Sequence, residues 1–453
     1  MGIVALTVAL LVSLALNGVV GVRYRHAEER IDALERQVLL QHDALEALRE
    51  RGDGGGGGGD PLAEIRAVVE GLRGLEFERR VKADVVTQAQ LSDRIERLFR
   101  GETSRREFEA SRQVLVALGV VDPDLDLWEA FIAVHQEQVG GFYDSKKRAL
   151  VVGARDARNP SPYTRFILAH EYTHALTDQH FDLGRLDRLQ EQRRYDAASA
   201  WRALVEGDAS LVQGLYLQQV LSLDEQLEVA AEAGKAPRAE FDRLPAFLQA
   251  SLLSPYLDGL AFVQALDANG GSEAIDRAYE DPPVSTEQIL HPFKYFEREE
   301  PMEVSVPDVR ARLGRDTWRT IDNGELGELD LRLLGDEPYA SGGLSSRDAE
   351  AAAEGWDGGA YVGLRSSRGD VVVAMLTAWD SESEAREAQN LFGQWLPLRY
   401  GNIGDPIDAG PTGSGWRGRD GTGMVLRAGD RVAFLFGPDE DTVRRARAAF
   451  EGF

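Results

Sequence analysis

The chain has no cysteine, and this absence excludes several kinds of protein at once. Without thiols there is no disulfide framework, no zinc site built on thiolates and no lipid attached through cysteine. Histidine is also scarce, with seven residues in 453, and methionine is scarcer, with four. Any metal ion bound by this chain would therefore be held by histidine, aspartate or glutamate.

Basic residues are too few and too scattered for a nucleic-acid-binding protein. The chain has 51 lysines and arginines against 76 aspartates and glutamates, a formal net charge of −25, and no run of basic residues. Binding to a phosphate backbone requires a basic stripe, so nucleic acid is not an expected partner. A hydrophobic content of 43% is ordinary for a globular protein, and the length suffices for two domains plus further segments.

The N-terminal segment is a long run without charge. Residues 3–22 (IVALTVALLVSLALNGVVGV) are long enough, as a helix, to cross the hydrocarbon core of a bilayer. A cleaved signal peptide is the alternative, but the basic segment that normally starts one is absent and the small-residue cleavage site is weak. We therefore expect residues 1–22 to be a single-pass membrane anchor. Arg23, Arg25 and Arg30 follow it, so the positive-inside rule favours a cytoplasmic location for the bulk of the chain, and an extracytoplasmic location stays open.

Residues 23–51 show a heptad-like pattern, which predicts a coiled-coil stalk and self-association into a homo-oligomer. The positions at a/d spacing are apolar except for Gln41; they are Ile31, Leu34, Val38, Gln41, Leu45 and Leu48. A single amphipathic helix is the alternative. Residues 52–60 contain six consecutive glycines, which predict a flexible linker between the stalk and the rest of the chain.

The segment His170-Glu171-Tyr172-Thr173-His174 has the pattern H-E-x-x-H and is the main candidate for a functional site in this chain. Ser161-Pro162 upstream predicts a capped helix start, and on a helix the four-residue spacing puts both imidazoles on one face. Two such histidines can bind one Zn²⁺, and Glu171 can act as general base on a water molecule at the metal. Two histidines in a polar interface would be the non-functional alternative.

A third ligand is expected on a later helix, predicted from Arg193 to Leu221. Glu206 lies there beside Ala203, Gly207 and Ala209, whose small side chains permit close approach of another helix. Such surroundings favour a metal ligand over a solvated surface carboxylate. We therefore predict His170, His174 and Glu206 as the ligands of one zinc ion.

The segment from about Gly140 to Leu215 resembles the gluzincin class of zinc metallopeptidases. HEYTHALTDQHFDL, ALVEGDAS and the later PPVSTEQILHP are also similar to uncharacterised bacterial membrane-associated metallopeptidases. The resemblance implies a zincin-like peptidase core in which His170, His174 and Glu206 bind zinc and Glu171 is the base. One departure is that Ser210 stands where thermolysin-like members have an aspartate that orients the first histidine, so the groups supporting the ligands stay unassigned.

His180 is the alternative third ligand, because it follows His174 by six residues, the spacing of the metzincin class. In that class a glycine lets the chain turn, whereas Thr177 occupies its place here and resists positive φ. The class also needs a methionine beneath the zinc, and only Met302 is conceivably placed. These departures favour Glu206.

Residues near the motif are candidates for handling substrate. Gln138–Asp144 and Arg148–Val152 predict a hairpin, and its first strand, through Gly141, Phe142 and Tyr143, could pair with a peptide substrate; a core hairpin is the alternative. His291, before Pro292, could stabilise the oxyanion or cap a helix end. The other candidates for the oxyanion are Tyr143, Tyr172 and Tyr195, and we expect His135 to be structural.

The C-terminal residues 301–453 have a different pattern. Tyr361–Arg365, Val371–Trp379, Gly423–Arg427 and Arg431–Phe436 are predicted strands, and Glu382–Trp395 and Asp439–Phe450 are predicted helices. The order strand-strand-helix occurs twice, which predicts a small accessory α+β domain. The expected fold class is therefore α+β: a mostly helical zincin-like metallopeptidase domain at 61–300 with an edge hairpin, then this accessory domain.

The expected function is that of a membrane-anchored zinc-dependent endopeptidase acting on a protein or peptide. Two alternatives stay open: a membrane-tethered binding or scaffold protein with a non-catalytic metal site, and a metal hydrolase of a non-peptide amide. The presence of Glu171 favours an enzyme, because a structural metal site has no need of that carboxylate.

Overall fold

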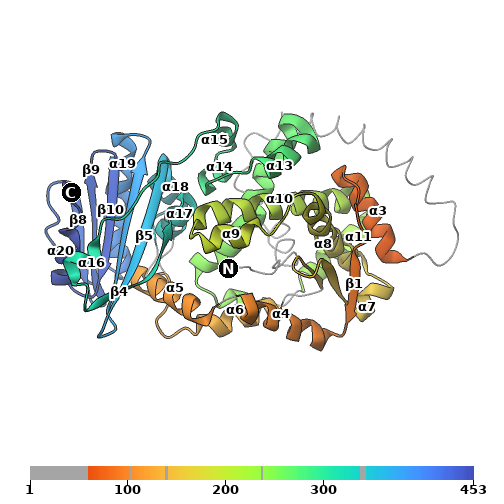
Figure 1. Cartoon of the computed structure of the whole chain (residues 1–453), viewed down its shortest axis with the longest axis horizontal. Coiled ribbons are helices and arrows are strands. Elements are labelled where there is room, and N and C mark those ends of the chain that lie inside the picture. The colour runs from red at the N-terminus through yellow and green to blue at the C-terminus, as the bar shows by residue number, and fades with distance from the viewer. Residues whose placement is uncertain (1–59, 103, 138–140, 236–237, 337–342) are drawn as a thin grey trace.

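The structure is a computed structural model that describes residues 60–102, 104–137, 141–235, 238–336 and 343–453 (Figure 1). Helices and strands are mixed: a mainly helical region with a three-stranded sheet precedes a seven-stranded antiparallel sheet. Element labels follow Figure 1 and begin at α3. The predicted anchor (1–22) and stalk (23–51), and the predicted linker up to residue 59, lie outside the described residues.

The small sheet contains β1 (Lys82–Val86), β2 (Gly141–Asp144) and β3 (Ala149–Gly153) in the order β1-β3-β2. The predicted hairpin is β2-β3, and β2 is an edge strand. Its alternate side chains face different helices, as the pleat of a strand requires. Tyr143 packs with residues of α8 (Pro162–His180), whereas Phe142 packs with residues of α4 (Gln88–Glu102).

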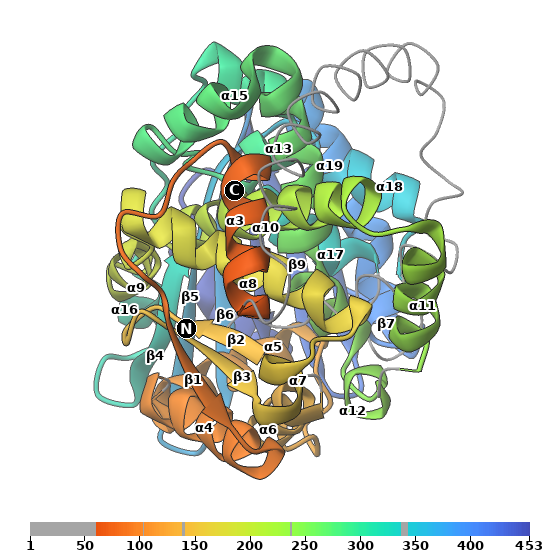
Figure 2. The ribbon, with the colours of Figure 1, turned by 90° about the vertical axis from the view of Figure 1, so that its right-hand side faces the viewer.

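Helix α8 is the central helix of this region. Ser161 caps it by accepting a hydrogen bond from the Thr164 N–H (3.1 Å), and Pro162 occupies the first turn. Every residue from Phe166 to Asp178 is buried. Helix α3 (Pro61–Arg73) lies against α8 (Figure 2). A helix enclosed on all sides can hold polar side chains in a fixed, water-poor environment.

Helix α10 (Tyr195–Gln219) packs on α8 and, more extensively, on α13 (Ala246–Glu280). The backbones of α10 and α13 nearly touch where they cross. A Cβ atom on Gly207 would lie 2.2 Å from the Gly259 carbonyl oxygen, and one on Gly259 would lie 2.1 Å from the Ala203 carbonyl oxygen. Ala203 and Gly207, two of the small residues near Glu206, therefore permit the close approach of α10 and α13.

Shorter helices complete the first region. They are α5 (Arg105–Leu118), α6 (Leu127–Glu137), α7 (Ala154–Arg158), α9 (Arg185–Glu191), α11 (Leu223–Ala233), α12 (Ala239–Asp242), α14 (Thr286–Leu290) and α15 (Pro292–Glu297).

The large sheet has the strand order β4-β5-β6-β10-β9-β8-β7. The strands are β4 (Trp318–Glu325), β5 (Trp356–Ser366), β6 (Val371–Trp379), β7 (Gly404–Pro406), β8 (Gly413–Gly418), β9 (Gly421–Ala428) and β10 (Arg431–Gly437); the helices with them are α16 (Val309–Leu313), α17 (Glu328–Asp336), α18 (Ser346–Ala353), α19 (Glu382–Arg399) and α20 (Glu440–Arg447). The predicted strand-strand-helix order appears as β5-β6-α19 and β9-β10-α20. Strands β4, β7 and β8 were not predicted.

Each face of the large sheet is covered by different helices. Val373 and Phe434 belong to a core cluster with Phe392 of α19, while Val372 and Ala433 belong to another with Val443 of α20. The first cluster also contains residues of α5, among them Phe108 and Val114. The packing therefore crosses the predicted boundary at residue 300, and α5 joins the two regions through a shared core.

One helix of the described part, α13, is long and apolar enough to span a membrane by length and composition. It is also a core helix, because Phe262, Val263 and Ile275 are buried against α10 and its neighbours. Its path is interrupted at Gly270 and Gly271, which have non-helical backbone angles. These features are those of an internal helix in a folded domain.

Candidate metal centre

The site begins with the two histidines of α8. His170 and His174 are one turn apart, so their rings project from the same side of the helix and lie edge to face, with centroids 4.6 Å apart. Both residues are almost completely buried, with exposed fractions of 0% and 4%. Their Nε2 atoms are 3.0 Å apart.

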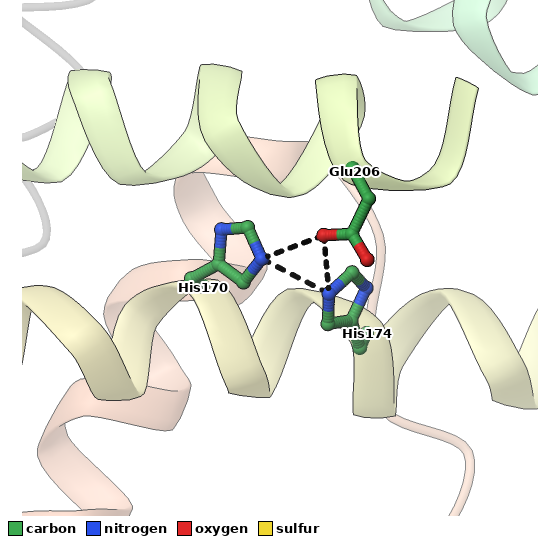
Figure 3. Close-up of side chains that lie close together, drawn as sticks. All are labelled: His170, His174 and Glu206. Carbon is green, nitrogen blue, oxygen red and sulfur yellow. Dashed lines mark hydrogen bonds and ion pairs between the residues drawn. The ribbon is translucent and has the colours of Figure 1, made fainter. Parts of the chain in front are cut away.

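Glu206 comes from α10, which runs alongside α8 above it in the view and directs the carboxylate toward the two rings (Figure 3). Its Oε2 atom lies 3.1 Å from His170 Nε2 and 3.3 Å from His174 Nε2. The three atoms thus form a nearly equilateral triangle. A tetrahedral zinc site with bonds of about 2.0–2.1 Å has ligand–ligand separations of about 3.3 Å, so the residues present fit such an ion.

Burial and the charges of neighbouring side chains shift the pKa values of the three side chains in different directions. Burial alone would raise the pKa of Glu206, but the charge of His174 and the hydrogen bonds from both histidines hold it well below its usual range. Burial lowers the pKa of His170. Burial also acts to lower the pKa of His174, but Glu206 outweighs it and the pKa is raised. Glu206 is therefore ionised and His170 neutral, as metal ligands must be, whereas His174 would have to release its proton when a divalent cation binds.

Glu171 is next to the first histidine and is held by the edge strand. Its Oε2 atom accepts a hydrogen bond of 2.8 Å from the Tyr143 N–H of β2. Burial raises the pKa of Glu171 to about 7, although His174 and the Tyr143 N–H oppose the rise. A carboxylate with a pKa near neutrality can both accept and release a proton at physiological pH.

Two side chains of α10 support the histidines, a role that the sequence left unassigned. Gln213 donates to the Phe166 carbonyl oxygen (3.0 Å), and a hydrogen-bonding contribution from Gln213 raises the pKa of His170. Asp208 is completely buried, and its charge contributes to raising the pKa of His174. The charge of Asp208 therefore reaches the second histidine.

A buried ion pair fixes Asp208 in place. Arg73, the last residue of α3, puts its Nε atom 2.8 Å from Asp208 Oδ1, and the Tyr279 hydroxyl donates to Asp208 Oδ2 (3.0 Å). The Arg73 guanidinium also pairs with Asp276 of α13 (2.7 Å). These contacts link α3, α10 and α13 through Asp208, which lies two residues from Glu206.

Two further side chains lie near the cluster. Arg202 precedes Glu206 by one turn of α10, and Tyr256 of α13 places its ring 6.1 Å from the His170 ring. Neither was identified from the sequence. A link between a residue near position 256 and a motif at 170 depends on the packing of α13, which has no local sequence signal.

The remaining candidate residues lie in other contacts. His180, the alternative third ligand, ends α8 and bonds through Nε2 to the Glu76 carbonyl oxygen (2.9 Å). His291 lies between α14 and α15 and bonds through Nε2 to Glu328 of α17 (2.9 Å). Neither belongs to the three-residue cluster of His170, His174 and Glu206.

The tyrosines considered for the oxyanion are also engaged elsewhere. The Tyr143 hydroxyl donates to Asp178 (2.8 Å), Tyr172 packs edge-on against Phe77, and Tyr195 stacks on Tyr361. The backbone of β2, from Gly141 to Tyr143, is the part of the predicted substrate strand that adjoins Glu171.

A second group of acidic residues could hold a cation by distance alone: Glu287, Glu299 and Asp380. Lys294 already lies among them, with its ammonium 2.5–2.9 Å from all three carboxylates. This group is therefore an ion-pair network that joins α14 and α15 to the end of β6.

Comparison with known proteins identifies one family. The model of the family described as Domain of unknown function (DUF8575) matches residues 314–447, which contain all seven strands of the large sheet and leave the candidate metal centre outside. No curated protein and no solved structure matches the chain.

Proposed function

We propose that this protein is a zinc-dependent endopeptidase with a zincin-like core, anchored to a membrane through residues 3–22. The observation that carries the proposal is the convergence of His170 Nε2, His174 Nε2 and Glu206 Oε2 beside the buried carboxylate of Glu171. The three donor atoms would hold the zinc ion, with Glu171 left free for proton transfer. When bound, zinc would supply Lewis-acid polarisation and lower the pKa of water.

Glu171 is suited to move the proton that hydrolysis of a peptide bond requires. The proton leaves the attacking water for the Glu171 carboxylate and then passes to the nitrogen of the leaving amine. The Tyr143 N–H stabilises the ionised form, and burial stabilises the protonated form, so the group can exist in both states near pH 7.

Strand β2 offers an edge along which a peptide backbone can bind. In an antiparallel pair, residues alternate between those bonded to the neighbouring strand and those facing away from it. The Tyr143 N–H faces Glu171, so Tyr143 is of the second kind, and Gly141, two residues earlier, shares its orientation. Because the Tyr143 N–H already donates to Glu171, a substrate strand would pair through the backbone of Gly141 and the carbonyl oxygen of Tyr143, which would place its backbone beside the catalytic base.

Zinc content and hydrolysis test the proposal together. We expect Glu171→Gln to retain zinc but to hydrolyse casein about 10²–10⁴-fold more slowly, because only the proton-transfer group is lost. Glu191→Gln, a surface change on α9, is the matched control and should have wild-type activity. Casein hydrolysis by Glu171→Gln at the wild-type rate, or hydrolysis that persists in excess chelator, would contradict the mechanism.

The third ligand is tested by a second pair of variants. Glu206→Ala should lose zinc, whereas His180→Ala should retain it, because His180 bonds to the Glu76 carbonyl oxygen and lies outside the cluster. The reverse result would assign the metal to the metzincin arrangement.

A further inference from the structure

A pocket of about 760 Å³ lies at the start of α8, and its lining does not include the three predicted metal ligands. Helix α8 and the segment before it contribute most of the lining, including the side chains of Tyr163, Ile167 and Leu168. Helix α11 contributes Glu228 and Glu232. The position of this pocket relative to the H-E-x-x-H motif decides whether a bound substrate can reach it.

The pocket lies on the same face of α8 as the predicted catalytic residues. Ile167 precedes His170 by three residues and Glu171 by four, and these spacings put the three side chains along one face of the helix. At the usual rise of an α-helix, three to four residues correspond to about 4.5–6 Å along its axis. The pocket is therefore one helical turn away from the groups that would carry out hydrolysis.

The edge strand β2 passes both the pocket and the predicted base. A Cβ atom on Gly141 would lie 3.8 Å from Leu168 Cδ2, and the Tyr143 N–H donates to Glu171. Residues two apart in an extended chain are separated by about 6.6 Å. A peptide bound along β2 with its scissile bond at Glu171 would therefore place a side chain at the pocket within about two residues of that bond.

The lining of the pocket is apolar on α8 and acidic on α11. Pro162, Ile167 and Leu168 supply apolar surface, and the charged side chains of the lining are both acids, Glu228 and Glu232. A lysine or arginine side chain has the matching character, because its aliphatic stem covers apolar surface while its charged end stays in contact with water. An acidic side chain would be repelled there.

The two acids differ in their present contacts. Both are exposed; Glu232 forms an ion pair with Lys235 (2.7 Å), whereas no described residue forms an ion pair with Glu228. Burial raises the pKa of the Tyr163 hydroxyl, and the charge of Glu232 adds to the rise, so Glu232 lies near enough to act on the pocket wall. A basic substrate side chain would give Glu228 a partner and compete with Lys235 for Glu232.

Resting on the proposed function, we propose that this pocket binds a lysine or arginine side chain of the substrate within two residues of the scissile bond. Glu228 and Glu232 are then specificity-determining residues that take no part in the chemistry. The apolar wall binds the stem of the side chain, and the two carboxylates select its charge. The preference should be moderate, about 10-fold, because both carboxylates are exposed and are screened by water and salt.

Peptide binding to a chain that cannot hydrolyse tests the pocket by itself. The protein is the metal-free full chain with Glu171→Gln. The probes are three peptides, acetyl-Ala-Ala-X-Ala-Ala-amide with X as lysine, norleucine or glutamate, and calorimetry gives their dissociation constants. We expect the lysine peptide to bind about 10-fold more tightly than the norleucine peptide, and the glutamate peptide to bind most weakly. Adding Glu228→Gln and Glu232→Gln should remove the difference between lysine and norleucine.

The matched control removes two acids elsewhere, because the net charge of −25 also attracts cationic peptides. Asp224→Asn on α11 and Glu191→Gln on α9 are changes at exposed positions that do not line the pocket, and together they should leave the order of the three peptides unchanged. Three results would overturn the proposal: equal binding of the lysine and glutamate peptides, no binding of any peptide, or a lysine preference that survives Glu228→Gln with Glu232→Gln.

Hydrolysis by the zinc-loaded wild type then locates the pocket along the substrate. In peptides with one lysine or one glutamate at successive positions, we expect kcat/KM to be about 10-fold higher for lysine at a position within two residues of the cleaved bond. Glu228→Gln with Glu232→Gln should abolish this preference, and cleavage without such a preference would contradict the proposal. If the wild type hydrolyses no peptide, the proposed function is refuted, and the binding measurements still decide whether the pocket selects basic side chains.

Discussion

The five histidines in the described part of the chain have different surroundings, and these surroundings determine which of them could bind a metal. His170 and His174 share a buried cluster with a carboxylate, whereas His180 is at a helix end bonded to a backbone oxygen and His291 pairs with Glu328. His135 is buried among aromatic rings, 5.5 Å from Phe99 between centroids. The metal-ligand roles of the first two stay predictions, and the structure adds that their donor atoms lie together.

His135 gives a prediction about pH and stability. Burial lowers the pKa of His135 to about 4, with the charge of Arg202 acting in the same direction and the Phe131 carbonyl opposing it. Because the unfolded chain takes up this proton near pH 6.5 and the folded chain only near pH 4, folding loses free energy as the pH falls between these values. The loss should approach about 3 kcal/mol at pH 4.

Urea unfolding of metal-free protein at several pH values checks this prediction. His135→Phe lacks the titrating group, so its free energy of unfolding should fall less than that of the wild type between pH 7 and pH 4. The other acidic groups titrate in both proteins and cancel in the difference. His180→Phe, at a partly exposed position, should follow the wild-type curve. Equal curves for wild type and His135→Phe would show that His135 is not held neutral.

At the level of helices and strands, the sequence predicted the features that depend on adjacent residues. It did not predict those that depend on contacts between distant residues. Ser161-Pro162 predicts the start of α8, and the continuous apolar, β-branched run Val371–Trp379 predicts β6, because caps and apolar runs are properties of adjacent residues. The parallel pairing of β1 with β3 joins residues more than sixty positions apart, and β7 and β8 are short and glycine-rich. Neither feature has a periodic signal.

In the candidate site, too, local features could be predicted from the sequence and long-range contacts could not. The motif on α8 and the acid on α10 were identified from the sequence, because their spacing and small neighbours are local features. Tyr256 and Gln213 were not, since their relation to His170 exists only after α8, α10 and α13 have packed together.

The crossing of α10 and α13 gives a prediction at this scale. In Gly207→Ala the new Cβ would lie 2.2 Å from the Gly259 carbonyl oxygen and 2.9 Å from Val263, so the two helices must move apart. We expect the free energy of unfolding to fall by about 1–3 kcal/mol, the usual effect of overpacking. Zinc affinity should fall too, because Glu206 is the adjacent residue. Urea unfolding and zinc titration measure the two effects.

Gly214→Ala is a matched control on the same helix. A Cβ at Gly214 has no heavy atom within 4 Å, so alanine should leave packing unchanged and stabilise the helix by about 0.5–1 kcal/mol. If both variants changed stability equally, the close approach of the helices at Gly207 would not be the cause.

At the scale of the whole molecule, the C-terminal sheet holds the start of the helix that carries Glu206. Arg194, the N-cap residue of α10, makes no side-chain cap of its own. Glu325 at the end of β4 supplies it: Oε2 accepts from the Ala197 N–H (3.3 Å), and Oε1 pairs with Arg194 Nε (3.0 Å). Asp322 of β4 pairs with Arg193 (3.3 Å). The region matched by the family model therefore contributes to the shape of the metal centre without contacting the three ligands.

Removing this cap should destabilise the helical region from a distance. A carboxylate at a helix start satisfies free N–H groups and interacts favourably with the helix dipole, so we expect Glu325→Ala to lower the free energy of unfolding by about 1–2 kcal/mol. Hydrogen exchange should show faster exchange in the first turn of α10, while β5 and β6 keep their protection. Glu303→Ala, at an exposed acid of the same region, is the control and should change neither quantity. Unchanged exchange at Ala197 in Glu325→Ala would show that α10 starts independently of the sheet, and the two regions would then be joined chiefly through α5.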